Sequence, residues 1–313
     1  MTDCPLKLYA GSSHPELAAE IAKHLHVKVE DMTLKRFACN EVFARPDSTV
    51  RGCDVYVVQT ATNNVNEDLM ELFIILDALK RSFATRVHVV MPHYGYARQD
   101  RVASPREPIS AKLVADLLSA AGADHVITLN LHSDQEQGFF NFPVDNLSAN
   151  KLFIEYFKRK RLENLVVVAP DTGAAKDAKK FADSMGAELA ILHKVRPDHN
   201  VAEVTEVVGD VQNKTCLIFD DMVDTAGTVV AGKEALIKHG ANPDIYLAAA
   251  HAVFSDPAIS RLKSAGFKEV VVTNSIPLPE EKIFEGLTII SVAGLLAKII
   301  QNVHKAKSVT EVF

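Results

Sequence analysis

The chain has 313 residues, of which 48% are hydrophobic and 24% are charged, and its formal net charge is −6 at pH 7, a composition typical of a globular protein with room for two domains. The acidic balance argues against binding to nucleic acid, and no apolar run is long enough to span a membrane. Four cysteines without metal-site spacing, and the lack of a signal peptide at the start of the sequence, predict a protein of the reducing cytoplasm.

Strands and helices alternate through the first half of the sequence. Apolar runs predict strands over residues 6–10, 54–59, 87–91 and 125–131. Helical periodicity predicts helices over residues 17–25, 66–81 and 109–121. Ser13 and Glu16 have the spacing of a capping box at the start of the first helix. Residues 27–37 indicate either a pair of strands or a strand and a loop.

A second cycle of strands and helices begins near residue 148. Strands are predicted over residues 165–169, 189–192, 204–208, 216–219, 245–251, 270–273 and 288–291. Helices are predicted over residues 151–160, 173–185, 229–239, 259–265 and 292–304. The fold class is therefore α/β, with two tandem doubly wound parallel-sheet domains.

A weak internal repeat supports the two-domain reading. It pairs residues 56–62 with 166–173, 88–100 with 216–228, and 127–133 with 271–277. We expect an amino-terminal domain of residues 1–146 and a carboxyl-terminal domain of residues 147–300. A tail of residues 301–313 is expected to pack on the amino-terminal domain.

The most informative stretch is TCLIFDDMVDTAGT, residues 215–228. An apolar strand leads to two aspartates, then to a loop of small residues that opens a helix. Such a loop offers backbone N–H groups to an anion, and the helix dipole adds positive charge there. The aspartates instead suit sugar hydroxyls, so together the pattern predicts a pocket for ribose 5-phosphate. The residues concerned are Asp220, Asp221, Asp224, Thr225, Ala226, Gly227 and Thr228.

This stretch resembles the PRPP-binding motif of type I phosphoribosyltransferases and of ribose-phosphate pyrophosphokinases (PRPP synthetases). Four further segments, RFACNE, ARQDR, NLHSDQ and HKVRPDHN, resemble only the pyrophosphokinases, and the resemblance covers essentially the whole chain. It implies two phosphoribosyltransferase-like domains. It also implies transfer of the β,γ-diphosphoryl group of MgATP to the 1-hydroxyl of ribose 5-phosphate, giving PRPP and AMP for nucleotide biosynthesis.

The resemblance assigns magnesium to His132 and Asp171, which both follow predicted strands. Taken alone, His132 is better explained by a hydrogen bond to backbone, and Asp171 can be explained by a role as helix N-cap. Because two protein ligands make a sparse site, the nucleotide must supply most of the oxygen ligands.

The segment HKVRPDHN corresponds to the family's catalytic loop and contains Lys194 and Arg196. Taken alone, these are two basic residues in a solvated loop. Phosphoryl transfer depends on positioning and on cations that meet developing charge. A loop that delivers both residues would also exclude water. Arg196 is further expected to contact ribose 5-phosphate.

The resemblance also implies an ATP site, in which Phe37 can stack on adenine. An ion pair with Asp100 is the structural alternative for Arg98. In the family the Phe-containing loop reaches the site from a neighbouring subunit, so a homo-oligomer, typically a hexamer, is implied. The expected ATP-binding residues are Phe37, Cys39, Asn40, Glu41, Arg98, Gln99, Asp100 and His132.

Some positions depart from the family's pattern. Cys39 and Asn40 replace an Asp-Gly pair, and Val102 and Ser104 replace two cations in a segment that contributes to a regulatory phosphate site in many members. This change predicts activity without added phosphate. Two alternatives to an active pyrophosphokinase remain, a PRPP-consuming phosphoribosyltransferase and a non-catalytic regulatory subunit. A PRPP-sensing transcription factor would need a DNA-binding domain, for which no residues are left.

Overall fold

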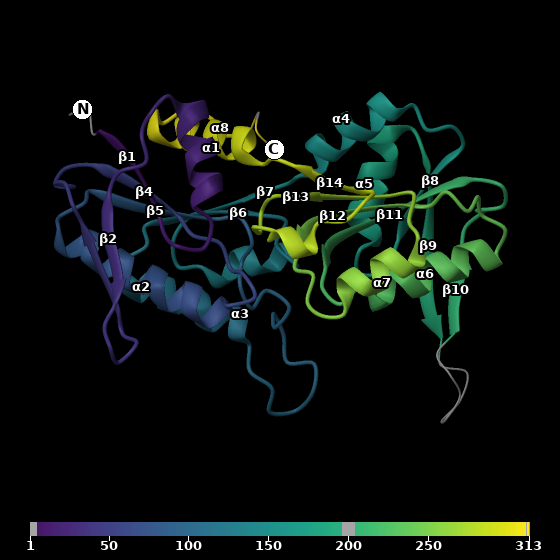
Figure 1. Ribbon diagram of the computed structural model, residues 1–313, viewed down its shortest axis with the longest axis horizontal. Coiled ribbons are helices and arrows are strands. Elements are labelled where there is room, and N and C mark those ends of the chain that lie inside the picture. Colours follow the sequence, from purple (N-terminus) through teal and green to yellow (C-terminus); the bar gives the residue numbers. More distant parts are fainter. Residues whose placement is uncertain (1–4, 196–203, 311, 313) are drawn as a thin grey trace. The chain divides into compact units, whose positions relative to one another are not determined.

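The computed structural model describes residues 5–195, 204–310 and 312 (Figure 1). The chain divides into two compact units. The first consists of Met1–Ser148, Ser275–Pro277 and Ser291–Phe313, and the second of Ala149–Asn274 and Leu278–Ile290. The chain thus leaves the first unit, forms the second, and returns.

The first unit is built on a parallel sheet with strand order β1-β4-β5-β6-β7. These strands are rich in valine and other apolar residues because both faces of the sheet are covered. They are β1 (Leu6–Ala10), β4 (Asp54–Val58), β5 (Arg86–Met91), β6 (His125–Leu129) and β7 (Val144–Leu147). The helices of this unit are α1 (Pro15–Leu25), α2 (Val65–Arg81), α3 (Ser110–Ala121) and α8 (Ala293–His304), with the 3-10 helix η1 (Asp134–Phe139).

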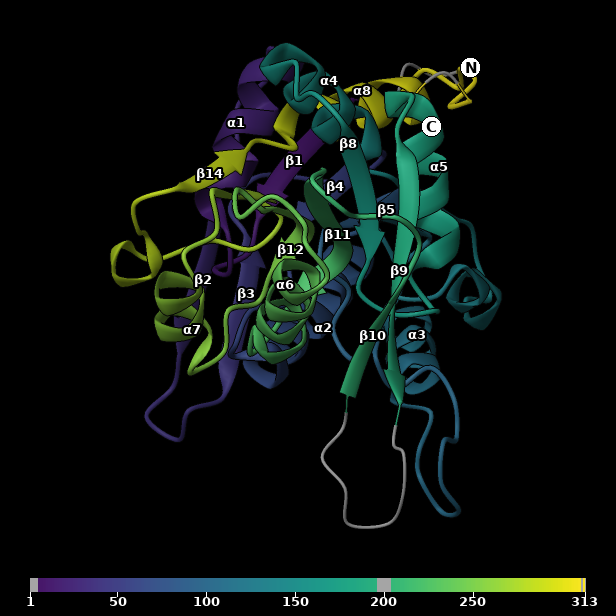
Figure 2. The ribbon, with the colours of Figure 1, turned by 90° about the vertical axis from the view of Figure 1, so that its right-hand side faces the viewer.

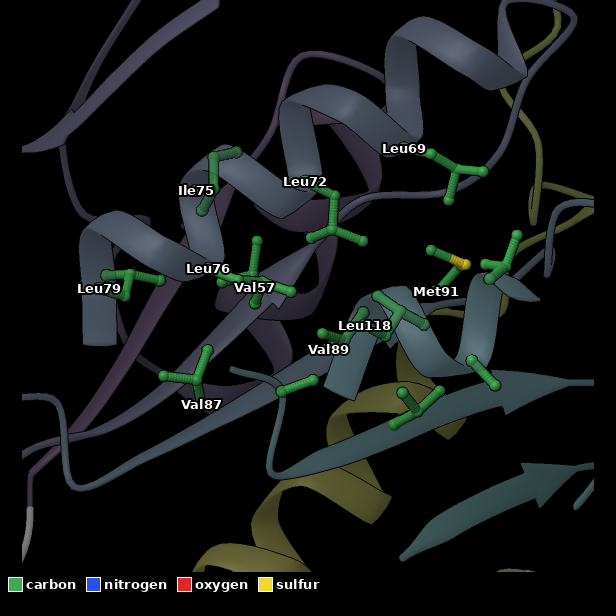
Figure 3. Packing of buried hydrophobic residues seen from close by; sticks show 14 of the residues in the cluster. Val57, Leu69, Leu72, Ile75, Leu76, Leu79, Val87, Val89, Met91 and Leu118 are labelled. Carbon is green, nitrogen blue, oxygen red and sulfur yellow. The ribbon is translucent and has the colours of Figure 1, made fainter. Parts of the chain in front are cut away.

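One core of the first unit lies between its sheet and the helices α2 and α3. Figure 3 shows Leu72 and Leu76 of α2 above Val57 and Val89 of the sheet, with Leu118 of α3 beside them. All five side chains are fully buried. The spacing of four residues between the two leucines puts both on one face of α2.

The helix α8 packs against α1, beside which it lies in Figure 1. The Ser291 hydroxyl, just before α8, donates to the Glu20 carboxylate of α1. The ring of His304 at the other end is 3.3 Å from Asp54 Oδ2. The expected domain border at residue 300 is therefore wrong, because α8 packs on α1 and belongs to the first unit.

A separate antiparallel ribbon is formed by β2 (Met32–Arg36) and β3 (Val42–Pro46). Arg36 lies opposite Val42, so only residues 37–41 are left to form the turn. Of the two readings of this segment, the pair of strands is the one that the structure shows.

The second unit is built on a sheet with strand order β10-β9-β8-β11-β12-β13-β14. All neighbours are parallel except β9 and β10, which form a long hairpin (Figure 2). The strands are β8 (Leu165–Ala169), β9 (Glu188–Val195), β10 (Val204–Val208), β11 (Thr215–Val223), β12 (Tyr246–Ala252), β13 (Glu269–Thr273) and β14 (Leu287–Ile290). The helices are α4 (Asn150–Lys160), α5 (Ala175–Met185), α6 (Gly227–Lys238) and α7 (Ala258–Ala265), with the 3-10 helix η2 (Glu280–Lys282).

The predicted α/β fold with two doubly wound units is confirmed. Two local predictions are wrong. His14, not Ser13, is the N-cap of α1, and its ring accepts a hydrogen bond from the N–H of Leu17. The repeat pairing of residues 127–133 with 271–277 is displaced by one strand. In the first unit β6 lies next to β5, and the corresponding neighbour of β11 in the second unit is β12, whereas residues 271–277 begin in β13. Among the described helices, none is long and apolar enough to cross a membrane.

Candidate functional site

The loop of residues 224–228 joins β11 to α6 in the second unit. Ala226 is the N-cap of α6 and has left-handed backbone angles, φ 61° and ψ 5°. This conformation turns the chain sharply from the strand into the helix that starts at Gly227. The first N–H groups of an α-helix have no acceptor within the helix. The side chains around them are small and Thr228 is exposed, so this loop, called the cup below, is a candidate site for an anion.

Asp220 and Asp221 precede this loop, and both belong to β11, which continues four residues past the predicted end at Phe219. Both side chains are half-buried, and the N–H of Asp221 donates to Asp220 Oδ1 at 2.9 Å. Burial raises the pKa of Asp220 well above its ordinary value, and the negative charges of Asp221 and then of Asp171 raise it further. Carboxylates crowded in this way are suited to a cation or to several hydroxyl donors.

Asp171 joins this carboxylate group from the neighbouring strand. Since β8 pairs with β11 in parallel, the residues that follow both strands lie at the same edge of the sheet. Asp171 Oδ1 accepts a hydrogen bond from the N–H of Ala174 at 3.0 Å, just before α5. A Cβ at Gly173 would lie only 3.1 Å from that oxygen, so glycine permits this tight turn. Asp171 therefore closes the turn before α5 and remains exposed. The alternative role as helix N-cap is wrong, because Ala174 is the N-cap of α5.

Of the two predicted catalytic cations, only Lys194 lies in the part of the chain that the structure describes. The backbone of Lys194 belongs to β9 and pairs with Thr205 of β10, so the hairpin is longer than the predicted strand and loop. Arg196 lies outside the described residues.

The turn of the β2–β3 ribbon carries the predicted adenine-binding residues. The N–H of Phe37 donates to the Glu41 carbonyl at 2.9 Å, and the N–H of Asn40 donates to the Phe37 carbonyl at 2.8 Å. Asn40 has a φ of 71°, which its short polar side chain tolerates. Phe37 is 46% exposed, and Cys39 is also exposed. The turn therefore presents an aromatic ring to solvent on a fixed backbone.

Arg36, the last residue of β2, stabilises this turn. Its Nη1 donates to the Asn40 carbonyl at 3.3 Å and forms an ion pair with the Glu67 carboxylate of α2 at 2.6 Å. The ring of Phe37 packs edge-on against Phe43 at 5.8 Å between centroids. Arg36 was not among the predicted site residues, although it begins the RFACNE segment.

The remaining predicted ATP-binding residues follow β5 and β6 in the first unit. Gln99 is held locally, because its side-chain oxygen accepts from the Ser110 hydroxyl at 2.6 Å and its carbonyl accepts from the N–H of Ala111 at 3.2 Å. Arg98 is exposed and Asp100 is half-buried. His132 is exposed in the short connection between β6 and η1.

The structure thus gathers the predicted residues into separate groups. Asp171, the aspartates of β11 and the 224–228 loop lie at the carboxyl edge of the second unit's sheet, whereas His132 belongs to the first unit. Among the described residues, no group of three or more His, Cys, Asp or Glu side chains has the geometry of a metal site. One residue that sequence reasoning missed, Arg261 of α7, donates a hydrogen bond to the Thr225 carbonyl. Its distance along the chain left no local signal.

Comparison with known proteins gives matches along most of the chain. Residues 6–122 match the family described as the N-terminal domain of ribose phosphate pyrophosphokinase. Residues 201–313 match the family described as the phosphoribosyl synthetase-associated domain.

Full-length relatives agree with these matches. The ribose-phosphate pyrophosphokinase of Caldanaerobacter subterraneus subsp. tengcongensis is 48% identical over 309 residues, which cover 98% of each chain. That of Bacillus subtilis is 47% identical over 311 residues, which cover 99% of this chain and 98% of the relative. The crystal structure of phosphoribosylpyrophosphate synthetase from Mycobacterium smegmatis has a TM-score of 0.92 at 47% identity, and the match covers 96% of this chain and 99% of that one.

Proposed function

Because the chain belongs to the ribose-phosphate pyrophosphokinase family, we propose that the residues described above divide the synthesis of PRPP between a sugar-phosphate site and a nucleotide site. The reaction transfers the β,γ-diphosphoryl group of ATP to ribose 5-phosphate. The 1-hydroxyl oxygen attacks the β-phosphorus and loses its proton, the bond from that phosphorus to the α,β-bridging oxygen breaks, and AMP leaves.

The sugar-phosphate site consists of the cup and the neighbouring carboxylates of the second unit. One observation carries this assignment: a helix that begins at Gly227 directs its first N–H groups into a loop of small residues, next to two half-buried aspartates. Residues 224–228 bind the 5-phosphate, and Asp220 and Asp221 bind the ribose hydroxyls. Burial of Asp220 supports this role, since a buried acceptor with a raised pKa is stabilised by hydroxyl donors.

The nucleotide site uses residues of the first unit. The exposed ring of Phe37 stacks on adenine, and the backbone of the β2–β3 turn, with Glu41, reads its polar edge. Arg98 contacts the phosphates, where a guanidinium can bind two oxygens at once. Gln99 and Asp100 follow it in the same connection, and the local contacts of Gln99 support a role in holding that connection.

Magnesium is the metal that the donor set fits. Hard cations prefer oxygen ligands, and Asp171 and the two aspartates of β11 are oxygen donors at the same edge of the sheet, without forming a three-ligand metal site among the described residues. A cation there would also offset the repulsion that raises the Asp220 pKa. We assign Asp171 and His132 as protein ligands, with Asp220 and Asp221 near the sugar. When bound with ATP, magnesium would neutralise charge on the phosphates.

Lys194 and Arg196 supply the positive charge that the transferring group needs. The pairing of Lys194 with Thr205 in the β9–β10 hairpin supports this role for Lys194, because β9 is the neighbour of β8, after which Asp171 follows. Arg196 also contacts ribose 5-phosphate. We further propose a cytoplasmic homo-oligomer, for which a hexamer is the expectation.

The two alternatives predict different activities. A single-domain phosphoribosyltransferase does not explain matches to pyrophosphokinases over 98% of the chain. A regulatory subunit would bind the substrates without turnover. Incubation of the pure protein with MgATP and ribose 5-phosphate, followed by detection of AMP and PRPP, tests the proposal.

A Thr228→Val variant tests the placement of ribose 5-phosphate. The change keeps the side chain's shape but removes one hydroxyl donor from the cup, which weakens the binding of a charged group by roughly 1.5–3 kcal/mol. The KM for ribose 5-phosphate should rise about tenfold or more, with the KM for ATP unchanged. Weaker binding of ATP alone would contradict the placement.

A further inference from the structure

Arg261 of α7 contacts the loop of residues 224–228, although it lies 36 residues further along the chain than Thr225. Its Nη1 donates a hydrogen bond to the Thr225 carbonyl at 3.0 Å. The same nitrogen is 3.4 Å from the position that a Cβ would have at Gly227. The guanidinium therefore lies against the loop at the point where the chain enters α6.

A second cation also links the two helices, and this one extends from α6 to α7. The ammonium of Lys233, a buried residue of α6, donates to the carbonyl of Gly266, which is the C-cap of α7. A positive charge at a helix C-terminus is favourable because the helix dipole is negative there. Lys233 also lies 5.0 Å from the centroid of the Phe267 ring. With α7 anchored in this way, Arg261 is held at a fixed place beside the loop.

The contact has a consequence for the direction of the loop's N–H groups. In a planar trans peptide, the carbonyl of one residue and the N–H of the next point in opposite directions. Because Arg261 holds the Thr225 carbonyl toward α7, the N–H of Ala226 points away from α7. Ala226 is also the residue in the left-handed conformation, which is unfavourable for a residue with a Cβ. The hydrogen bond from Arg261 thus stabilises the loop at its most strained residue.

We propose that Arg261 is a positioning residue for ribose 5-phosphate, which acts by holding the 224–228 loop in the conformation that receives the phosphate. This inference rests on the proposed function of that loop. A loop that is already ordered loses less conformational entropy when the ligand binds, so its affinity is higher. Arg261 itself does not need to touch the substrate.

Substitution of Arg261 should therefore affect one substrate only. Arg261→Met removes the guanidinium and keeps an unbranched stem at an exposed position. We expect a rise of about tenfold in the KM for ribose 5-phosphate, as for the loss of one hydrogen bond by a charged donor. The KM for ATP and the turnover at saturating substrates should stay near the wild-type values.

Lys263 provides the matched control, because it is also an exposed cation of α7. Lys263→Met changes the charge of the helix equally but leaves the contact with Thr225 intact. An equal rise in KM for both variants would show a general effect of charge and would overturn the inference. Arg261→Lys keeps the charge without the guanidinium geometry and should give an intermediate KM.

Thermal unfolding with and without ribose 5-phosphate completes the test. All three variants should unfold near the wild-type temperature, and Arg261→Met should gain less stabilisation from the ligand than the wild type. If Arg261→Met does not fold, the comparison of Arg261→Lys with Lys263→Met decides.

The Thr228→Val variant separates this inference from the function on which it rests. If Thr228→Val weakens ribose 5-phosphate binding and Arg261→Met does not, the positioning role is wrong and the proposed function stands. If Thr228→Val binds ribose 5-phosphate normally, the assigned phosphate site fails, and the role of Arg261 fails with it.

Discussion

Lys194 is the residue for which the chemistry predicts the largest single effect. Its backbone is fixed by pairing with Thr205 in the β9–β10 hairpin, next to the end of that hairpin. A cation placed there would interact with the phosphoryl group most strongly when negative charge develops in the transition state. Its removal should therefore affect turnover more than substrate binding.

We expect Lys194→Ala to lower kcat by about two orders of magnitude or more, with KM values changed by only a fewfold. Steady-state kinetics with each substrate varied in turn measure both effects. A variant with nearly normal kcat and a much higher KM for ATP would show that Lys194 serves ground-state binding instead.

His88 in β5 belongs to a buried polar group of the first unit that is separate from the proposed site. Its Nδ1 is 3.0 Å from His125 Nδ1, and His125 Nε2 is 3.1 Å from the Asp145 carboxylate. The ring of His88 also stacks on Tyr56 at 4.3 Å. Burial, and then the neighbouring His125, lower the pKa of His88 to about 3.

This shift predicts a pH-dependent stability. The unfolded chain binds a proton at His88 below about pH 6.5, whereas the folded chain does so only near pH 3. The stabilising contribution is thus complete above about pH 6.5 and is lost progressively as the pH falls toward 3, by about 1.4 kcal/mol per pH unit. The charges of Asp54 and Asp124 oppose the shift, and that of Arg86 adds to it.

Urea unfolding at pH 7.5 and pH 5 tests this prediction. His88→Gln, which stays neutral, should show a weaker dependence on pH than the wild type. His24→Gln, a change at an exposed histidine of α1, should show the wild-type dependence. Equal dependence in the wild type and His88→Gln would exclude His88 as the source.

At the scale of elements, the connection between β5 and α3 contains a carboxylate, that of Glu107, which binds backbone N–H groups of the same connection. Glu107 Oε2 accepts hydrogen bonds from the N–H groups of Ala103 at 3.0 Å and of Ser104 at 2.8 Å. Adjacent N–H groups that converge on one oxygen are the arrangement by which backbone binds phosphate. Here a carboxylate of the protein already occupies them. This observation agrees with the expectation drawn from Val102 and Ser104, which stand where the family resemblance implies two cations.

We therefore expect full activity without added phosphate. An assay in a phosphate-free buffer, with and without millimolar phosphate, measures the effect directly. Glu107→Gln should bring in some phosphate dependence, because it removes the competing charge. An absolute requirement for phosphate in the unchanged protein would refute the expectation.

Helices and strands show most clearly how much of the fold could be predicted from the sequence. Helices such as α2 and α3 and buried strands such as β5 were predicted closely, because their periodicity is a local property. The end of β11 was missed, since two aspartates resemble a turn when their place beside β8 and β12 is unknown. Ser13 was misread as a cap, because its hydroxyl instead accepts the N–H of Thr60, 47 residues away in the chain.

The candidate site shows the same limit. The loop of residues 224–228 could be proposed as a phosphate site from sequence because all its residues are adjacent, and this role stays a prediction. Arg261 was missed because only the packing of α7 on α6 brings it to the loop. The roles of His132 and Arg98 stay predictions.

For the whole molecule, the return of the chain to the first unit predicts that a substitution in α8 lowers the stability of that unit. Leu296 of α8 is fully buried, whereas Lys298 is exposed. Leu296→Ala should destabilise the first unit by about 2–5 kcal/mol, since it leaves a cavity. Lys298→Ala, on the same helix, should have little effect.

Amide hydrogen exchange locates the effect. In Leu296→Ala, the strands β1 and β4 of the first unit should lose protection, while β11 and β12 of the second unit keep it. Loss of protection mainly in β11 and β12 would mean that α8 belongs to the second unit after all.

The return of residues 291–313 to the first unit also constrains the order of events during synthesis. A ribosome releases the chain from its amino end, and domains that are contiguous in sequence generally fold as they emerge. The whole second unit lies within residues 149–290, interrupted by Ser275–Pro277, whereas the first unit is completed only by α8, which is translated after them. The half that is made first is therefore finished last. Until then the face of α1 that α8 covers stays open to chaperones, and a translational pause just before residue 291 would prolong that exposure.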